Sequence, residues 1–146
     1  MPAKYKLVLR KDMRKDAAEG SKLYYASANT TGTCDVYELC DLISAQSTAS
    51  SGDVKLILDE LVNVMRRNLG KGEVVKVGEL GSFQLQFGST GTLTEKEFNQ
   101  VLIKSRRIVF RPGKLLKEAV KNYTFEKIAS GAPDEGGGED DRPGEL

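Results

Sequence analysis

The sequence contains no histidine and only two cysteines among its 146 residues. Without histidine, a Ser-His or Cys-His catalytic pair and an imidazole metal ligand are excluded, and two cysteines are too few for a structural zinc site. Cys34 and Cys40 are six residues apart on an expected helix, about 240° around its axis, so they cannot bridge each other. We interpret both as reduced, buried, small apolar side chains.

Long apolar runs and phosphate-binding loops are also missing. The run Leu7-Val8-Leu9 is too short for a signal-peptide core or a membrane span. The segments Gly70-Lys71-Gly72 and Pro112-Gly113-Lys114 lack the full glycine-rich loop and its following Ser or Thr. We therefore expect a cytoplasmic protein that is not an enzyme, with no metal ion, cofactor, membrane or small-molecule substrate.

Charge is close to balanced over the whole chain but unevenly placed. The net charge is +1, yet residues 66–121 contain twelve Lys and Arg against five Asp and Glu. The end of the chain after Ile128 is net acidic by five charges and rich in Gly. Because it has almost nothing to bury, we expect residues 129–146 to be a disordered acidic tail.

Two short strands open the chain. Residues 4–10 and 22–26 have strand-like composition, and residues 11–20 between them are polar without a helical stripe. We expect residues 1–32 to form an N-terminal β extension.

Two helices should follow this extension. Thr33 is expected to cap a helix from Cys34 to about Ala45. Residues 50–53 have the spacing of a capping box, which predicts a longer helix over about residues 52–69 that Gly70 ends.

The longer helix has an apolar face of about 160°, wider than the usual stripe of a surface helix. A face this broad needs more than one packing partner, and a second copy of the chain is the economical choice. The alternative is that the N-terminal extension covers the excess. The residues expected at a dimer interface, from both helices and the sheet, are Leu39, Ile57, Leu61, Val64, Met65, Phe83 and Phe110.

A sheet follows the helices. The apolar run 74–77, a turn at 78–81 and the alternation of Phe83, Leu85 and Phe87 predict a hairpin with one buried face. A further strand is expected over residues 104–110.

The rest of the chain should be a short helix, a strand and one small turn. Pro112 favours a helix start, and the helix is expected over residues 115–123, followed by a strand over 124–128. Residues 94–98, between the two long strands, are predicted to form a capped single helical turn.

Basic side chains gather on the last strand and the last helix. Lys114, Lys117 and Lys121 fall within about 60° on one side of the helix, with apolar residues opposite. Lys104, Arg106 and Arg107 place charge on both faces of their strand, which a strand buried on one side could not accept. That part should project as an arm stump, with burial resuming at Ile108 and Phe110. The expected phosphate-binding residues are Lys76, Lys104, Arg106, Arg107, Arg111, Lys114, Lys117 and Lys121.

Two motifs in this region resemble a known family. Gly81-Ser82-Phe83, preceded by Gly72 and Val75, and Phe110-Arg111-Pro112-Gly113-Lys114 are similar to the bacterial histone-like HU and integration host factor family. The extended ends and altered arm resemble the HU-like proteins of Bacteroidetes. The likeness covers residues 33–121.

The resemblance implies an α+β fold with a helical N-terminal half, an antiparallel β-sheet and an intertwined homodimer. It also places Arg111 and Lys114 near the phosphate backbone. The family's β-arm ends in an Arg-Asn-Pro-x-Thr-Gly tip, whose proline wedges between base pairs. That tip is absent here, so we expect a truncated or altered arm without an exposed apolar wedge.

Together these features predict a nucleoid-associated protein that binds double-stranded DNA mainly through its backbone, with residues 33–128 as the DNA-binding domain. The alternative is an HU-fold dimeric scaffold or protein-interaction module that has lost DNA binding. The sequence leaves open whether DNA is bent, which DNA form is preferred and whether RNA binds.

Overall fold

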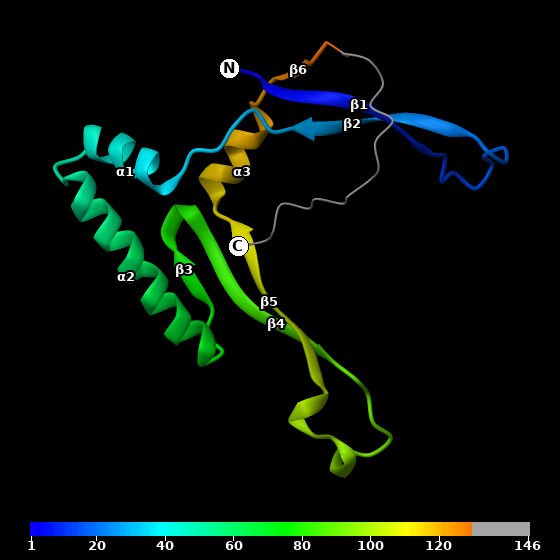
Figure 1. The fold of residues 1–146 in the computed structure, drawn as a ribbon. Helices are drawn as coiled ribbons and strands as arrows, with labels where there is room; N and C mark the ends of the chain where they lie inside the picture. Colours follow the sequence, from blue (N-terminus) through cyan, green and yellow to red (C-terminus); the bar gives the residue numbers. More distant parts are fainter. Residues whose placement is uncertain (130–146) are drawn as a thin grey trace. The chain divides into compact units, whose positions relative to one another are not determined.

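The computed structural model describes residues 1–129, and the expectation of a disordered tail lies almost wholly outside them. Among these residues the chain forms two compact units, one built from residues 1–34 and 121–129 and the other from residues 35–120. Each is described by itself below. The order of strands and helices is β1-β2-α1-α2-β3-β4-β5-α3-β6 (Figure 1).

The first unit is a three-stranded sheet. β1 (Ala3–Lys11) and β2 (Lys22–Asn29) pair antiparallel in continuous register from Lys4 opposite Asn29 to Lys11 opposite Lys22. β6 (Phe125–Lys127) runs parallel to the start of β1, which gives the order β2-β1-β6. The two strands expected at the N-terminus are confirmed, and β2 extends three residues further than predicted.

The second unit opens with two helices, α1 (Val36–Ala45) and α2 (Ser51–Gly70). The cap of α1 is Asp35 rather than the expected Thr33, because the Asp35 carboxylate accepts the Glu38 backbone N–H at 2.9 Å. A carboxylate at this position also interacts favourably with the positive end of the helix dipole. Cys34 therefore precedes the helix and is exposed, so the expectation of burial is wrong for it and right for Cys40.

The start of α2 is the predicted capping box, and its end differs from the prediction. The Ser50 hydroxyl accepts the Asp53 backbone N–H at 3.1 Å, and the Asp53 carboxylate accepts the Ser50 backbone N–H at 3.2 Å. Hydrogen bonding of the Asp53 carboxylate to the Ser50 side chain, and next to the Ser50 backbone N–H, holds the pKa of Asp53 below its usual value. Gly70 remains helical, and the left-handed residue that follows is Gly72, with φ of 83°. Glycine adopts that conformation without a Cβ clash.

The sheet of the second unit has the order β3-β4-β5. β3 (Val75–Val77) and β4 (Gly81–Ser89) form the predicted hairpin, joined by a single 3₁₀ turn over Gly78–Leu80. β5 (Ile103–Pro112) pairs antiparallel with β4 from Ile103 to Pro112, with one irregularity between Lys104 and Arg107. Phe83 and Phe110 lie opposite each other, with ring centroids 4.9 Å apart.

Gly81 and Gly113 allow two backbones to approach closely where β5 meets α3 (Lys114–Lys121). A Cβ at Gly81, whose φ is 141°, would overlap the Arg111 carbonyl and the Phe110 ring, and a Cβ at Gly113 would overlap the Glu79 carbonyl. Pro112 ends β5 instead of opening the helix, so its fixed φ serves an extended segment.

The described chain buries very little apolar surface. The buried hydrophobic side chains are Cys40, Val54 and Leu69, while Ile57, Phe110 and Leu116 are at least two-fifths exposed. A chain of this length would ordinarily bury a much larger share of its apolar side chains. Most of the apolar face of α2 is therefore uncovered in a single copy. Within residues 1–129, no helix has both the length and the apolar character needed to cross a membrane.

Candidate nucleic-acid interface

The eight basic residues expected to bind phosphate are all exposed. Among the ion pairs of residues 1–129, only one includes any of them, between Lys114 Nζ and Glu118 at 4.0 Å, and both side chains are mostly in solvent. Arg107 donates to the Gln86 side-chain oxygen at 3.3 Å. An exposed ion pair such as Lys114–Glu118 contributes little to stability. The charges of all eight basic residues therefore remain available to a ligand. The eight residues are Lys76, Lys104, Arg106, Arg107, Arg111, Lys114, Lys117 and Lys121.

The register of the sheet brings three of these residues to one face. Lys76 on β3 lies opposite Ser82 on β4, which lies opposite Arg111 on β5. Residues directly opposite each other share a face of the sheet, and so do residues two or four positions apart on one strand. Arg107, about 13 Å along β5 from Arg111, is therefore on the same face.

The other face of this sheet is apolar. Val75, Phe83 and Phe110 occupy the next row across the same three strands. The two rows lie on opposite faces, so one face of the sheet is apolar and the other mainly basic and polar. The basic face also includes Val109, which lies opposite Gln84 and between Arg107 and Arg111 on β5. We call the residues Lys76, Ser82, Arg107 and Arg111 the basic face of the second sheet.

A β-bulge explains how charge occupies both faces further along β5. Between the pairs Gln86–Arg107 and Gly88–Lys104, β5 contains one residue more than β4. Ser105 in this stretch has φ of 54°, in the left-handed region. A bulge bends a strand and re-aims its side chains, so Lys104 and Arg106 need not follow the alternation of residues 107–112.

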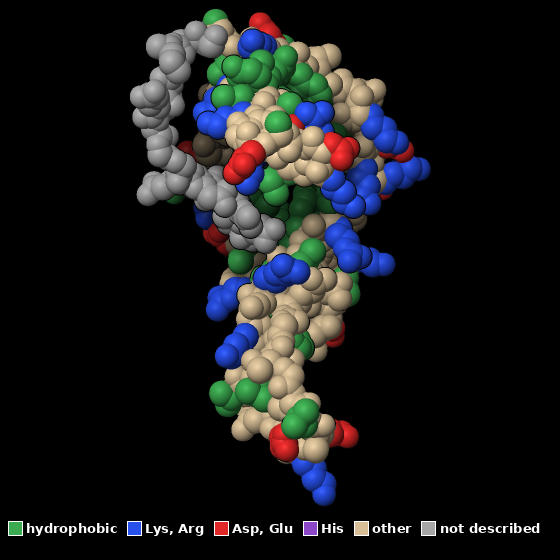
Figure 2. All heavy atoms as spheres, turned by 90° about the vertical axis from the view of Figure 1, so that its right-hand side faces the viewer, with side chains coloured by type: hydrophobic (Ala, Val, Ile, Leu, Met, Phe, Trp, Pro, Cys, Tyr) green, Lys and Arg blue, Asp and Glu red, His purple; other side chains and the backbone are tan. Residues whose placement is uncertain are grey.

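The part of the chain beyond this bulge is an arm, which we define as residues 87–106. It contains the ends of β4 and β5 and two 3₁₀ turns, and it projects from the rest of its sheet (Figure 1). The arm is altered but longer than the expected stump. Ile108 and Phe110 are also 40% and 41% exposed in a single copy, so burial does not resume there within one chain. Figure 2 shows Lys and Arg side chains at several heights along the arm.

The end of the arm corrects two expectations. The predicted turn is present over Glu95–Glu97, but Thr94 makes no side-chain capping bond. A second turn, over Gln100–Leu102, is capped by Asn99. Leu93 at this end is 98% exposed, so the expectation of an arm without an exposed apolar tip is wrong, although the proline motif of the family is absent as the sequence shows.

The lysines of α3 are exposed as predicted, but the opposite side of the helix is also uncovered. Leu115 and Val120 are each 58% exposed. Their packing partners are therefore not supplied by the described residues of a single copy.

The expected dimer-interface residues share this property. None of them is buried in a single copy, and Ile57 is the most exposed of them at 63%. The others are Leu39, Leu61, Val64, Met65, Phe83 and Phe110.

One group of basic residues was not predicted as a site. Lys6 and Arg10 on β1 are exposed and lie four positions apart on the same strand. The signal in the sequence is the alternation of basic with apolar residues over 4–10, a pattern that by itself indicates only a strand.

Comparison with known proteins places this geometry in a family. Residues 1–127 match the model of the HU-HIG family, described as an HU domain fused to a wHTH, Ig or glycine-rich motif. DNA-binding protein HU of Thermotoga maritima is 35% identical over 86 residues, which cover 58% of this chain and 96% of the relative. Integration host factor subunit alpha of Vibrio cholerae is 33% identical over 92 residues, covering 62% of this chain and 94% of the relative.

A solved structure from Bacteroides vulgatus, described as a candidate bacterial DNA-binding protein, has a similar fold. The TM-score is 0.60 at 22% identity over 86% of this chain, which spans 48% of that longer protein. The expected α+β fold and the resemblance to HU and integration host factor are confirmed. With a family match that extends from the first residue to β6, the chain belongs to the HU-HIG family of HU-domain proteins.

Proposed function

We propose that this chain is a histone-like, nucleoid-associated protein that binds double-stranded DNA mainly through the phosphate backbone, with weak sequence preference. The observation that carries the proposal is the row of Lys76, Ser82 and Arg111 across three strands, extended by Arg107 on the same face. The similarity to proteins named DNA-binding protein HU and integration host factor supports the same function.

The chemistry of this face suits phosphate. Lysine and arginine displace counterions from DNA, and this term is independent of sequence. Arg111 and Arg107 can each donate two hydrogen bonds to one phosphate, and the hydroxyl of Ser82, which lies between Lys76 and Arg111, can donate one more. Lys104 and Arg106 on the arm, and the three lysines of α3, would add further phosphate contacts.

We assign the working form to a homodimer in the nucleoid, with residues 33–128 as the DNA-binding domain. The uncovered apolar side chains of α1, α2 and β5 support this, because a second copy would bury them. The arm would then follow the duplex, with Leu93 as its wedge, since an apolar side chain can enter between base steps and kink the duplex. We expect no catalysis and no small-molecule substrate.

The test is a salt titration of DNA binding by the double variant Arg106→Ala with Arg107→Ala. Each lost phosphate contact should reduce the slope of log K against log salt concentration by about 1. The loss of affinity should be similar for duplexes of unrelated sequence. Fluorescence anisotropy measures both quantities.

The matched control removes two positive charges elsewhere, with Lys55→Ala and Lys71→Ala on α2 and at its C-terminal end. This variant should keep the wild-type slope. If the protein is a scaffold that has lost DNA binding, the wild type should show no measurable affinity for duplex DNA even at low salt. That result would contradict the proposed function.

A further inference from the structure

The N-terminal sheet also has two unlike faces. On β1, the residues at even positions from Lys4 to Arg10 lie opposite Asn29, Ser27, Tyr25 and Leu23 of β2. The residues at odd positions include Leu7 and Leu9, opposite Ala26 and Tyr24. One face is therefore mostly apolar, and the other is rich in cations and hydrogen-bond donors. We call Lys4, Lys6, Arg10, Tyr25 and Ser27 the basic face of the N-terminal sheet.

Two cations on this face have no acidic partner among residues 1–129. Lys4 forms an ion pair with Glu126, its neighbour on β6. Lys6 and Arg10 belong to none of the ion pairs in the described part of the chain. Tyr25, 40% exposed, lies on the same face between them, opposite Val8. Its hydroxyl can donate to phosphate.

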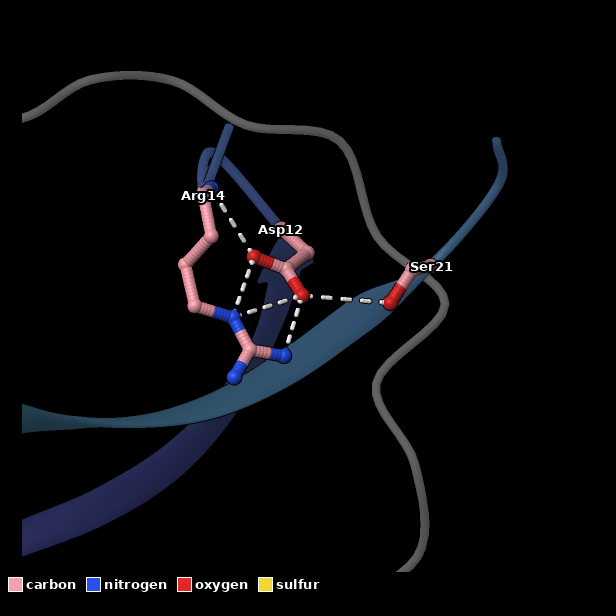
Figure 3. Close-up of polar contacts among 3 residues, drawn as sticks. All are labelled: Asp12, Arg14 and Ser21. Atoms are coloured by element: carbon pink, nitrogen blue, oxygen red, sulfur yellow. Dashed lines mark hydrogen bonds and ion pairs between the residues drawn. The ribbon is translucent and has the colours of Figure 1, made fainter. Parts of the chain in front are cut away.

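The nearest acid in sequence, Asp12, is paired with Arg14 instead of with these cations. Its side chain is fully buried at the end of β1. The carboxylate accepts the Arg14 backbone N–H and its Nε, each at 3.0 Å, a terminal guanidinium nitrogen at 2.6 Å and the Ser21 hydroxyl at 3.2 Å (Figure 3). The Arg14 guanidinium lowers the pKa of Asp12, with the backbone bond adding to the effect. This carboxylate is thus occupied within its own turn.

The charge of the two units favours a role for this sheet. Residues 1–34 and 121–129 contain nine Lys and Arg against four Asp and Glu, a net charge of +5. Residues 35–120 contain twelve against eleven, a net charge of +1. The smaller unit therefore has the stronger attraction for a polyanion per residue, although the motifs that identify the family lie in the larger one.

We propose that the basic face of the N-terminal sheet is a second binding surface for the phosphate backbone of duplex DNA, with Lys6 and Arg10 as the ion-pairing residues and Tyr25 and Ser27 as neutral donors. This inference rests on the proposed DNA binding of the chain. Lys6 and Arg10 are about 13 Å apart along β1, so they contact different phosphates. The surface adds affinity and length of contact without reading bases.

The test is the full-length double variant Lys6→Ala with Arg10→Ala, titrated with salt against a long and a short duplex. The slope of log K against log salt should fall by about 1 for each lost contact. The loss should be larger on the long duplex, which can reach both surfaces. The charge-conserving variant Lys6→Arg with Arg10→Lys should retain wild-type binding, and unchanged circular dichroism would show that the sheet still folds.

Two results would overturn the second surface. The first is that Lys6→Ala with Arg10→Ala keeps the wild-type salt slope and affinity for duplex DNA, while Arg106→Ala with Arg107→Ala still weakens binding. The other is a loss confined to single-stranded RNA or to a protein ligand, with duplex DNA unaffected. If Arg106→Ala with Arg107→Ala keeps wild-type binding while Lys6→Ala with Arg10→Ala loses affinity, the proposed phosphate contacts of the arm are wrong. The DNA-binding surface on the N-terminal sheet is then still supported.

Discussion

Gly113 lies between β5 and α3, where the chain passes directly over the backbone of Glu79. A single methyl group at this position would overlap the Glu79 carbonyl, which belongs to a 3₁₀ turn and cannot rotate away as a side chain could. The Gly113 N–H also donates to the Leu80 carbonyl at 3.0 Å. One small residue thus sets how α3 leaves the sheet.

Gly113→Ala should therefore destabilise the fold by about 1–3 kcal/mol, because the backbone must shift to accommodate the Cβ. Denaturant unfolding at a fixed protein concentration measures the change. The matched control is Gly91→Ala on the arm, where an added Cβ meets nothing within 4 Å, and it should stay within about 0.5 kcal/mol of the wild type. Equal stability of the two variants would contradict this account of Gly113.

At the level of helices and strands, most of the architecture was predictable from periodicity and capping. The capping box of α2 and the hairpin of β3 and β4 follow from local patterns, and local interactions hold them in the structure. The cap of α1 was misplaced because Thr33 and Asp35 are both good capping residues. Only the backbone path decides which of them reaches a free N–H.

The candidate site was only partly predictable, for a different reason. Lys76, Arg107 and Arg111 share one face because of the register in which β3, β4 and β5 pair. The sequence of one strand alone does not determine that register. The bulge at Ser105 depends on pairing with β4. Lys6 and Arg10 were missed as a surface because a face of a sheet is visible only when the partner strand is placed.

The arm is the element whose tip can be tested directly. Replacing Leu93 by Ala should reduce DNA bending, since an apolar wedge would be removed from the end of the arm. Energy transfer between dyes at the two ends of a duplex should fall toward the value of free DNA. Affinity should change by less than about tenfold, since the phosphate contacts of the arm remain.

The control for the wedge is Thr90→Ala, which alters another exposed residue on the arm while leaving Leu93 in place. It should leave the energy transfer unchanged. If the Leu93→Ala variant bends the duplex as much as the wild type does, Leu93 is not the wedge.

At the scale of the whole molecule, the small core of a single copy is the dominant fact. Only Cys40, Val54 and Leu69 are buried apolar side chains in residues 1–129, whereas a stable domain offsets its conformational entropy by burying many more. The uncovered residues of α1, α2, β5 and α3 are therefore where a second chain would contribute most to stability. Folding and association should be one process.

This predicts that Ile57→Glu disrupts both, because a carboxylate would enter the dimer interface without a partner. Sedimentation equilibrium should give the wild type twice the chain mass of 16.0 kDa, and its melting temperature should rise with protein concentration. The variant should lose this dependence together with its tertiary structure. Val101→Glu, at an exposed position on the arm, should remain dimeric. A wild type that sediments as a folded monomer at micromolar concentration would contradict the assembly and require the apolar face of α2 to be covered from within one chain.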